Sequence, residues 1–405
     1  MHILLLTNYF APETVGSGIW ITQMASELRR RGHSITVITS FPSYPRGAIS
    51  SGYRNRWFSR EQTNGIEVIR TYTYATPSKN FWPRVRSFGT FCASSALAYL
   101  PHRVRADAVY AILPPLPLGV SAWLIARASS ARLLVNIQDL YPDVAVALGY
   151  LRSRPALWFF RWMERWIYRR SHRIVVVSEG FRQNLLGKGV PFDKIRVVPN
   201  WADPDAISPA EKNNQFRREL NASGEFLVLY SGGLTHNAAL EPVLEAARIL
   251  AEERIRFVIV GEGVQKEELV RRAQNLGLNR VSFLPFQPLD RYPEVLAAAD
   301  LTLVTLSPAA TFLSVPSKIF KQMAAARPIL AITNPGSELT RLVVESGCGW
   351  AVAPDDVEGL VRKLREASQN PELLETMGGN GRRYLEQHGS LAGCVSAIEE
   401  ILREL

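Results

Sequence analysis

The sequence predicts an α/β protein built from two doubly wound domains in tandem. Short β-branched and apolar runs alternate with longer amphipathic stretches along the whole chain, which is typical of βαβ units and mostly parallel sheets. The 405 residues are also too many for one compact core. A turn-rich stretch at residues 199–209 separates two successive series of strand-like runs, so we expect a domain boundary there.

Each half of the chain has its own series of expected strands. In the first half these are residues 2–7, 34–39, 66–71, 107–112, 132–137, 173–178 and 195–198. In the second half they are residues 225–231, 256–261, 280–284, 300–305, 328–332 and 349–352. From Asp355 onward the chain is expected to be helical. We expect a first domain over residues 1–200, a second over 201–388, and a terminal helix over 389–405 that crosses back to the first domain.

The positive charge is concentrated in the first half. Residues 1–200 hold 26 Lys and Arg against 10 Asp and Glu, whereas residues 201–405 hold 21 against 27, and the whole chain carries +10. A basic half predicts an anionic partner, for which a membrane surface, a nucleic acid and a phosphorylated substrate are the candidates.

Cysteine and histidine spacing argues against metal and redox chemistry. The three cysteines, Cys92, Cys348 and Cys394, form no motif and are expected to be small buried thiols in a reducing compartment. The six histidines form no zinc-binding spacing. With neither a basic leader nor an apolar run of spanning length in view, we expect a cytoplasmic protein.

Glycines lie between a strand and the following helix at three places, where backbone N–H groups can hold a phosphate. They are Gly16 with Gly18, Gly232 with Gly233, and Gly261 with Gly263 around Glu262. Any tight βα turn can use glycine, so each pair alone is weak support for a ligand site. The dinucleotide fingerprint GxGxxG does not follow the first strand, which disfavours hydride transfer. In tandem doubly wound domains, ligands are expected in the cleft at the carboxyl ends of the strands.

Several longer segments together resemble one family. They are NYFAPETVGSG, residues 30–47, VNIQDLYPD at 135–143, residues 176–190, VVPNWAD at 197–203, the YSGG turn, FLPFQP at 283–288 and VPSKIFKQMAAARPILA at 315–331. In this order they are similar to the GT-B glycosyltransferases of family 4, and among these to bacterial enzymes of surface-polysaccharide assembly of the colanic acid and N-acetylfucosaminyl type. The fold class is then GT-B, with two Rossmann-like domains.

The resemblance implies that the second domain binds a nucleotide-sugar donor, that the first binds the acceptor, and that the sugar is transferred with retention. Lys318 and Ser317 would stabilise the charge of the leaving diphosphate, since fixed cations lower the barrier for its departure. The amides of Gly232 and Gly233, with His236, would hold the phosphate, and the loop of Gly16 and Gly18 would close on the sugar or acceptor. The nucleotide base and ribose would lie against Gly261, Glu262, Pro285 and Phe286. No metal and no separate cofactor is needed by this scheme.

The chain departs from the broader family at several positions. A pair of glutamates common in the family falls at Leu313 and Lys321, and neither side chain can accept a hydrogen bond from a sugar or ribose hydroxyl. Thr235 and Ala239 stand where many members of the family have basic residues. Lys318 and His236 are expected to take the place of those basic residues. We interpret these changes as the character of the subgroup.

Two carboxylates are candidate catalytic residues. Asp139 ends a buried-type strand at the expected cleft, where it could accept the acceptor's proton or stabilise a developing oxocarbenium ion. Asp143 is the second candidate. Either one could instead cap the turn that follows the strand. A mechanism in which the leaving phosphate takes the acceptor's proton needs neither as a base.

Aromatic and basic residues share two segments of the first domain. Residues 153–170 place Trp158, Trp162 and Trp166 on one helical stripe and Arg161, Arg165 and Arg169 on the next, while residues 79–105 carry Trp82 and Arg84. This pattern predicts interfacial helices on an anionic membrane, where a lipid-linked acceptor would also be found. The alternative is that the aromatic side chains pack into the core.

The sequence favours a glycosyltransferase that moves a sugar from a UDP-sugar to a lipid-linked saccharide in surface-polysaccharide assembly, at the inner face of the cytoplasmic membrane. One alternative is a sugar-nucleotide 2-epimerase of similar fold. The other is a basic nucleic-acid-binding protein, which only the isoelectric point of about 9.6 suggests.

Overall fold

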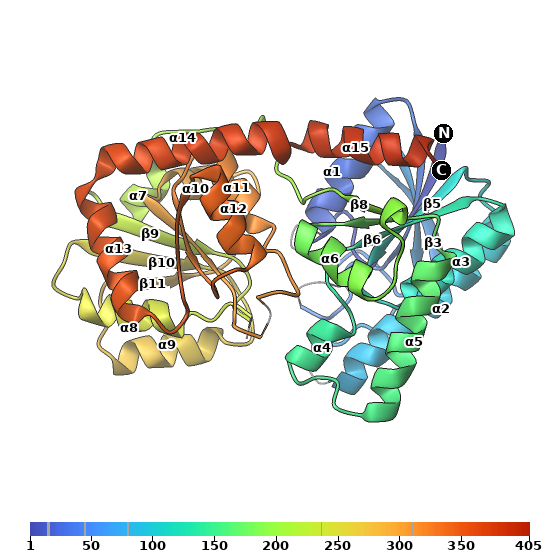
Figure 1. The fold of residues 1–405 in the computed structure, drawn as a ribbon, viewed down its shortest axis with the longest axis horizontal. Helices are drawn as coiled ribbons and strands as arrows, with labels where there is room; N and C mark the ends of the chain where they lie inside the picture. The colour runs from blue at the N-terminus through green and yellow to red at the C-terminus, as the bar shows by residue number, and fades with distance from the viewer. Residues whose placement is uncertain (14–16, 44–45, 79–80, 236, 310) are drawn as a thin grey trace. The chain divides into compact units, whose positions relative to one another are not determined.

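A computed structural model describes residues 1–405 except 14–16, 44–45, 79–80, 236 and 310. The chain divides into two compact units (Figure 1). Unit 1 comprises Met1–Pro199 together with Leu391–Leu405, and unit 2 comprises Asn200–Ser390. These limits lie within two residues of those expected from the sequence.

Within the described residues, unit 1 contains an eight-stranded sheet in the order β3-β4-β2-β1-β5-β6-β7-β8, parallel except for β3. The strands are β1 (His2–Leu6), β2 (Ser34–Ser40), β3 (Phe58–Thr63), β4 (Ile66–Thr71), β5 (Ala108–Leu113), β6 (Arg132–Ile137), β7 (Arg173–Val176) and β8 (Ile195–Val197). All six residues of β5 are buried. A continuous apolar run is typical of a parallel strand that helices cover on both faces.

The helices of unit 1 connect these strands or cover the sheet. They are α1 (Ser17–Arg30), α2 (Phe81–His102), α3 (Leu118–Ser129), α4 (Asp143–Ala147), α5 (Arg154–Arg170), α6 (Glu179–Gly187), one turn of 3-10 helix (Phe192–Lys194) and α15 (Leu391–Arg403). No helix within the described residues has the length and apolar character needed to cross a bilayer.

Strand β3 was not expected from the sequence. It alternates exposed and partly buried residues at the edge of the sheet and pairs antiparallel with β4 through a tight turn at Asn64 and Gly65. Both turn residues have positive φ, 52° and 72°. Asn-Gly is a typical turn of a two-residue β-hairpin, so this dipeptide is the local signal that could have predicted the strand.

Unit 2 contains a parallel sheet of six described strands in the order β11-β10-β9-β12-β13-β14. They are β9 (Phe226–Ser231), β10 (Ile255–Val260), β11 (Val281–Leu284), β12 (Leu301–Thr305), β13 (Ile329–Ile332) and β14 (Gly349–Val352). Its helices are α7 (Gln215–Glu219), α8 (Glu241–Ile249), α9 (Lys266–Asn275), α10 (Tyr292–Ala297), α11 (Lys318–Ala324), α12 (Glu338–Ser346), α13 (Val357–Gln369) and α14 (Pro371–His388).

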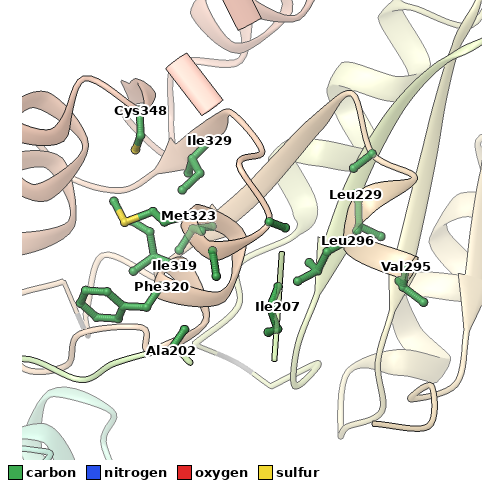
Figure 2. Packing of buried hydrophobic residues seen from close by; sticks show 14 of the residues in the cluster. Ala202, Ile207, Leu229, Val295, Leu296, Ile319, Phe320, Met323, Ile329 and Cys348 are labelled. Carbon is green, nitrogen blue, oxygen red and sulfur yellow. The ribbon is translucent and has the colours of Figure 1, made fainter. Parts of the chain in front are cut away.

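Helix α11 is held by the core of unit 2. Ile319, Phe320 and Met323 are buried on its apolar face beside Ile329 of β13 and Cys348 (Figure 2). Burial raises the pKa of the Cys348 thiol to about 11, and all three cysteines are buried thiols, as expected. Close packing of this face fixes the helix, and thereby the position of Lys318 at its first residue.

The strand order locates the switch point of each sheet. β1 lies between β2 and β5, and β9 lies between β10 and β12, so the chain turns in opposite directions after these strands. Ligands of doubly wound sheets bind at the carboxyl ends of the strands at such a point. The turns after β1 and β5 in unit 1, and after β9 and β12 in unit 2, are therefore where a site is expected.

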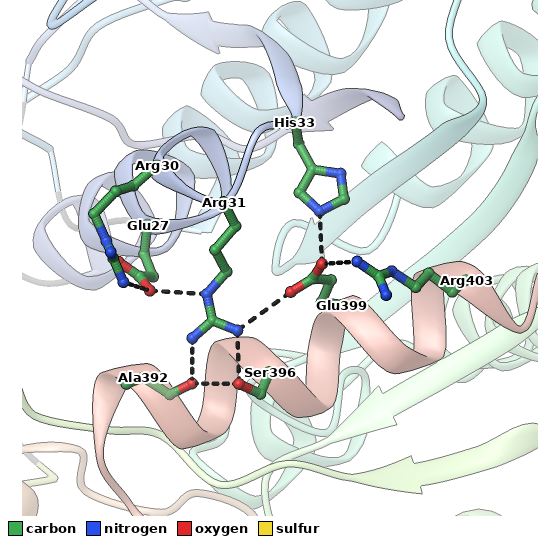
Figure 3. Close-up of polar contacts among 8 residues, drawn as sticks. All are labelled: Glu27, Arg30, Arg31, His33, Ala392, Ser396, Glu399 and Arg403. Carbon is green, nitrogen blue, oxygen red and sulfur yellow. Dashed lines mark hydrogen bonds and ion pairs between the residues drawn. The ribbon is translucent and has the colours of Figure 1, made fainter.

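Helix α15 packs on α1 of unit 1 through a polar network (Figure 3). The Arg31 guanidinium donates to the Ser396 hydroxyl at 2.6 Å, to the Ala392 carbonyl at 2.8 Å and to the Glu399 carboxylate at 3.2 Å. His33 Nε2 lies 3.1 Å from the other oxygen of Glu399. The C-terminal helix thus belongs to the same compact unit as the N-terminal strands.

Candidate functional site

Lys318 lies at the switch point of unit 2. Its Nζ is 3.7 Å from the centroid of the Tyr230 ring, at the end of β9. Burial lowers the pKa of this lysine to about 7, and no ion pair to a carboxylate offsets this among the residues that the structure describes. The side chain is therefore a partly desolvated cation whose charged form an anion would stabilise.

Three glycines let the backbone and Lys318 come together. A Cβ atom at Gly232 would lie 3.1 Å from Lys318 Nζ and 3.4 Å from the Tyr230 hydroxyl. A Cβ at Gly261 would overlap the carbonyl oxygen of Gly232, and one at Gly263 would overlap that of Leu234. The turns after β9 and β10 consequently run in direct contact, which only residues without a side chain permit.

One part of the expected phosphate cradle is wrong. The Gly232 amide donates to the Val260 carbonyl at 3.0 Å, and the next turn adds a bond from the Leu234 amide to the Glu262 carbonyl at 2.9 Å. A donor already paired in the sheet edge is not available to a phosphate. The Gly233 amide has no backbone acceptor among the described residues, and Gly233 is exposed, so it remains a candidate.

Ser317 and Lys318, at the start of α11, lie next to the turn after β9. Ser317 precedes the helix, and its hydroxyl makes no capping hydrogen bond to the helix. Lys321, one turn later, lies over the Tyr292 ring at 5.4 Å, and burial lowers its pKa too. Leu313 is partly buried. Two lysines with lowered pKa, both over tyrosine rings, thus occupy this helix.

The loops after β9 and β12 contact one another. The Ser307 amide donates to the Asn237 carbonyl at 2.9 Å, and Thr305 donates its hydroxyl to the Ala238 carbonyl. Asn237 Oδ1 and the buried Ser307 hydroxyl have no partner among the described residues. Thr235 is exposed, Ala239 is partly buried, and His236 lies outside the described residues.

The expected base and ribose residues follow the neighbouring strands. Glu262 follows β10 and pairs with Lys266 at 2.6 Å, with its side chain 43% exposed. Pro285, exposed, and Phe286, partly buried, follow β11. Since β11, β10 and β9 are adjacent, these residues lie in a row along one edge of the sheet with Gly232.

In unit 1, Asp139 follows β6 at the same edge as the switch point. It lies beside Pro114, Leu116 and Tyr141, around a gap too small to hold a water molecule. Burial, and then the charge of Asp139, raises the pKa of the Tyr141 hydroxyl to about 12. Gln138 donates to Asn136 at 2.7 Å, and Asn136 donates to the buried Tyr110 hydroxyl at 2.7 Å. The backbone that carries Asp139 is thereby held by a buried polar chain.

Asp143 has a different environment. Its Oδ2 accepts a bond from Lys188 at 2.6 Å, and the same ammonium binds the buried Glu164 at 2.6 Å. Tyr168 donates its hydroxyl to Glu164 at 3.0 Å. Asp143 therefore balances a lysine that links α4, α5 and α6, which points to a structural role.

The loop after β1 is held by Arg70, a residue that the sequence analysis missed. This arginine is fully buried, although it lies on β4. It donates to the Ala11 and Ser40 carbonyls and pairs with Glu61 of β3. Gly18 lets the loop pack on α1, because a Cβ there would lie 3.0 Å from the Glu13 carbonyl. Gly16 lies outside the described residues.

Two glycosyltransferase family models match the chain one after the other. The model described as "Glycosyl transferase 4-like domain" matches residues 15–201, and the model described as "Glycosyl transferases group 1" matches residues 211–384. The chain belongs to the glycosyltransferases. The resemblance that the sequence motifs indicated is confirmed, and the comparisons give no support to the epimerase alternative.

Two relatives and one solved structure are informative for this glycosyltransferase. It is 27% identical over 407 residues to WcaI of Escherichia coli K12, described as a colanic acid biosynthesis glycosyl transferase, covering 98% of this chain and 100% of that protein. It is 26% identical over 288 residues to WbjE of Pseudomonas aeruginosa, described as a glycosyltransferase, covering 71% and 72%. The structure of Anabaena Alr3699/HepE in complex with UDP and glucose covers both chains fully, with a TM-score of 0.75 at 17% identity. At that identity the similarity shows the GT-B fold.

The aromatic residues of the glycosyltransferase's α5 divide into two groups. Trp158 is 66% exposed and Trp162 47% exposed, with the exposed arginines Arg161, Arg165 and Arg169 around them. The core-packing alternative is therefore wrong for these two tryptophans. The Trp166 ring instead packs on that of Trp123 of α3, with the ring centroids 4.9 Å apart, beneath Arg170, and both rings are partly buried.

Helix α2 presents the second expected surface. Trp82 is 72% exposed, and Arg84 is exposed with its guanidinium 5.9 Å from the Phe88 ring. Across the described part of the glycosyltransferase, no three His, Cys, Asp or Glu side chains gather as they would around a metal ion.

Proposed function

We propose that this glycosyltransferase moves a sugar from a UDP-sugar to a lipid-linked saccharide in surface-polysaccharide assembly, with retention at the anomeric carbon. The observation that carries the proposal is Lys318, a lysine with lowered pKa that lies beside Gly232 at the β9/β12 switch point. A diphosphate fits this site, because it brings a negative charge to an ammonium that is partly desolvated and lacks an ion-pair partner among the described residues. The colanic acid relative and the UDP complex of the structural neighbour agree with this assignment.

The proposed transfer breaks one bond, forms one bond and moves one proton. The bond from the anomeric carbon to the diphosphate oxygen breaks, and a bond to the acceptor oxygen forms on the same face of the sugar. The acceptor's proton passes to the departing diphosphate, which leaves as a nucleoside diphosphate. Lys318 and the Ser317 hydroxyl stabilise the developing charge, and Asp139 stabilises the oxocarbenium character of the sugar. No metal enters this scheme.

Donor binding is tested by thermal shift. Purified protein is melted with UDP, GDP, dTDP and their common sugars, because a ligand of the folded state raises the melting temperature by mass action. We expect a shift with the UDP compounds that Lys318→Ala reduces. No shift with any nucleotide would overturn the donor assignment, and a larger shift with GDP or dTDP would replace the base.

Membrane attachment is part of the same proposal. The exposed Trp158, Trp162 and Trp82 lie among arginines of α5 and α2, and each basic residue near an anionic surface adds about 1 kcal/mol. We expect the protein to sediment with phosphatidylglycerol vesicles and not with phosphatidylcholine vesicles. Trp158→Ser with Trp162→Ser should weaken this binding, whereas Trp57→Ser, at a 70% exposed tryptophan outside both helices, should not. Equal sedimentation of all variants would contradict the proposal.

A further inference from the structure

An apolar groove of about 270 Å³ lies within unit 1. Its walls come from α2, from the β5–α3 turn, from the region of α4 and from α5. Among the described residues that line it, only Arg84 is charged, and Phe88, Tyr150, Phe160 and Met163 are among the large side chains. A mostly apolar lining with one charged group is the usual composition of a ligand site.

The groove reaches the edge of the sheet at the candidate catalytic residue. Pro114, Leu116 and Tyr141 line the groove and also lie beside Asp139. Asp139 itself does not line the groove, but it lies behind three residues that do. These three residues connect the groove to the acceptor side of the proposed reaction.

Gly89 of α2 lines the groove. It lies in the interior of α2, where glycine makes a helix less stable than alanine does. A Cβ atom at this position would meet no atom within 4 Å, so no described neighbour requires a glycine. A small side chain at this position would therefore fit, whereas a large one could extend into the groove.

The size and rim of the groove indicate its occupant. An apolar cavity of about 150 Å³ holds benzene, so this groove has room for roughly ten carbons of one chain. A lipid with two acyl chains would have to place the second elsewhere. Trp82, Trp158 and Trp162 are exposed on the two helices that form its walls, as side chains at a bilayer interface would be. Arg84 supplies a cation for a phosphate.

We propose that this groove binds the first isoprene units of a polyprenyl diphosphate acceptor, with Arg84 contacting the diphosphate. The inference rests on the proposed function, because it specifies the lipid of the acceptor. It commits to a single branched chain with a diphosphate head, which enters the groove while the rest of the chain stays in the membrane.

The experiment measures the binding of geranyl diphosphate, a ten-carbon probe, by isothermal titration calorimetry. Inorganic diphosphate serves as the probe that lacks the chain. We expect wild-type protein and Gly89→Ala to bind geranyl diphosphate alike and at least tenfold more tightly than diphosphate. Gly89→Phe, which places a large side chain in the groove, should lower the affinity for geranyl diphosphate tenfold or more. Arg84→Gln should weaken the binding of geranyl diphosphate more than the binding of geraniol.

A matched variant controls for a bulky residue in a helix. Gly379 lies in α14, where a Cβ would also meet nothing within 4 Å, so Gly379→Phe should leave binding unchanged. The melting temperature and the UDP shift of each variant show whether it is folded. Unchanged binding by Gly89→Phe, or equal affinity for diphosphate alone, would overturn the proposal. So would a change of oligomeric state in Gly89→Phe, because the groove would then be a contact between copies.

The outcomes separate this inference from the proposed function. If the UDP shift and transfer to a lipid acceptor are present but geranyl diphosphate does not bind, the groove assignment fails alone. If geranyl diphosphate binds in the groove but no nucleotide binds, the proposed transfer fails and the lipid site stands.

Discussion

The Lys318 ammonium lies 3.7 Å from the centre of the Tyr230 ring, and Gly232 is the residue that lets it approach. A ring face attracts a cation but does not replace the hydrogen bonds that the cation had in water. The charged form of Lys318 is therefore less stable in the folded protein than in water, and a bound anion would offset this loss of free energy.

Lys318→Met should stabilise the free protein and weaken donor binding together. Burial lowers the pKa of the Lys318 ammonium to about 7, from about 10.5 in the unfolded chain. Below pH 10.5 protonation therefore favours the unfolded state, and this destabilisation is largest below pH 7. The rise in melting temperature should therefore be larger at pH 6 than at pH 9. Loss of a charged hydrogen bond worth about 1.5–3 kcal/mol should reduce UDP-sugar affinity roughly 10- to 100-fold. A variant that melts lower than wild type would show that the lysine supports the fold.

The affinity for a UDP-sugar should fall as the pH rises above about 7. The free lysine loses its proton in this range, and the ligand binds its charged form, so binding takes up a proton and weakens toward tenfold per pH unit. A sugar nucleotide is the right probe, since its diphosphate has no proton to lose there. Calorimetry between pH 6 and pH 8.5 measures the effect, and Lys318→Met should abolish it. Equal affinity of the wild-type protein for the UDP-sugar at pH 6 and at pH 8.5 would contradict the proposal that the charged form of Lys318 binds the diphosphate.

Gly261→Ala should destabilise unit 2 by about 1–3 kcal/mol, because the new methyl group overlaps the Gly232 carbonyl and forces the two turns apart. Gly233→Ala is the matched control, since its Cβ would only contact Thr235 Cγ2 at 3.7 Å. Urea unfolding gives both free energies. Similar values for the two variants would mean that the turns adjust freely.

Asp139→Asn and Asp143→Asn should have opposite effects. The first should reduce transfer at least 100-fold with little change in melting temperature, as expected for a general acid, base or charge stabiliser. The second should lower stability by about 1–3 kcal/mol, because it removes one partner of Lys188, and should leave transfer by the folded protein largely intact. Activity and unfolding are measured on the same samples. If Asp143→Asn abolishes transfer at unchanged stability, the roles are reversed.

Arg31→Ala should loosen α15 from unit 1. The variant loses three bonds to that helix, including the one to Glu399, each worth about 0.5–3 kcal/mol. Hydrogen exchange over residues 391–403 should accelerate. The hydrogen bond to His33 lowers the pKa of the Glu399 carboxyl below its usual 4.5. The ionised Glu399 therefore stabilises the folded protein above pH 4.5, and this contribution is lost as the pH falls through the lowered pKa of Glu399. Exchange that is unaffected by Arg31→Ala would assign the docking to apolar contacts.

The alternation of apolar runs was enough to predict the parallel strands, because each run such as Ala108–Leu113 is buried as a whole and shows this in consecutive residues. Strand β3 was missed for the opposite reason, since an edge strand with one polar face carries little apolar signal. The Asn64-Gly65 turn was its only local mark.

The motif around Lys318 could be recognised in the sequence, and so could Asp139 at the end of its strand. What the sequence could not contain is the partner of each group. Tyr230, whose ring contacts Lys318, lies 88 residues before it in the sequence. The Val260 carbonyl accepts a hydrogen bond from the Gly232 amide, and Lys188 forms an ion pair with Asp143. The groove beside Gly89 likewise needs α2 and α5 together. Periodicity is a property of neighbouring residues, whereas desolvation and pairing depend on residues that only folding brings into contact.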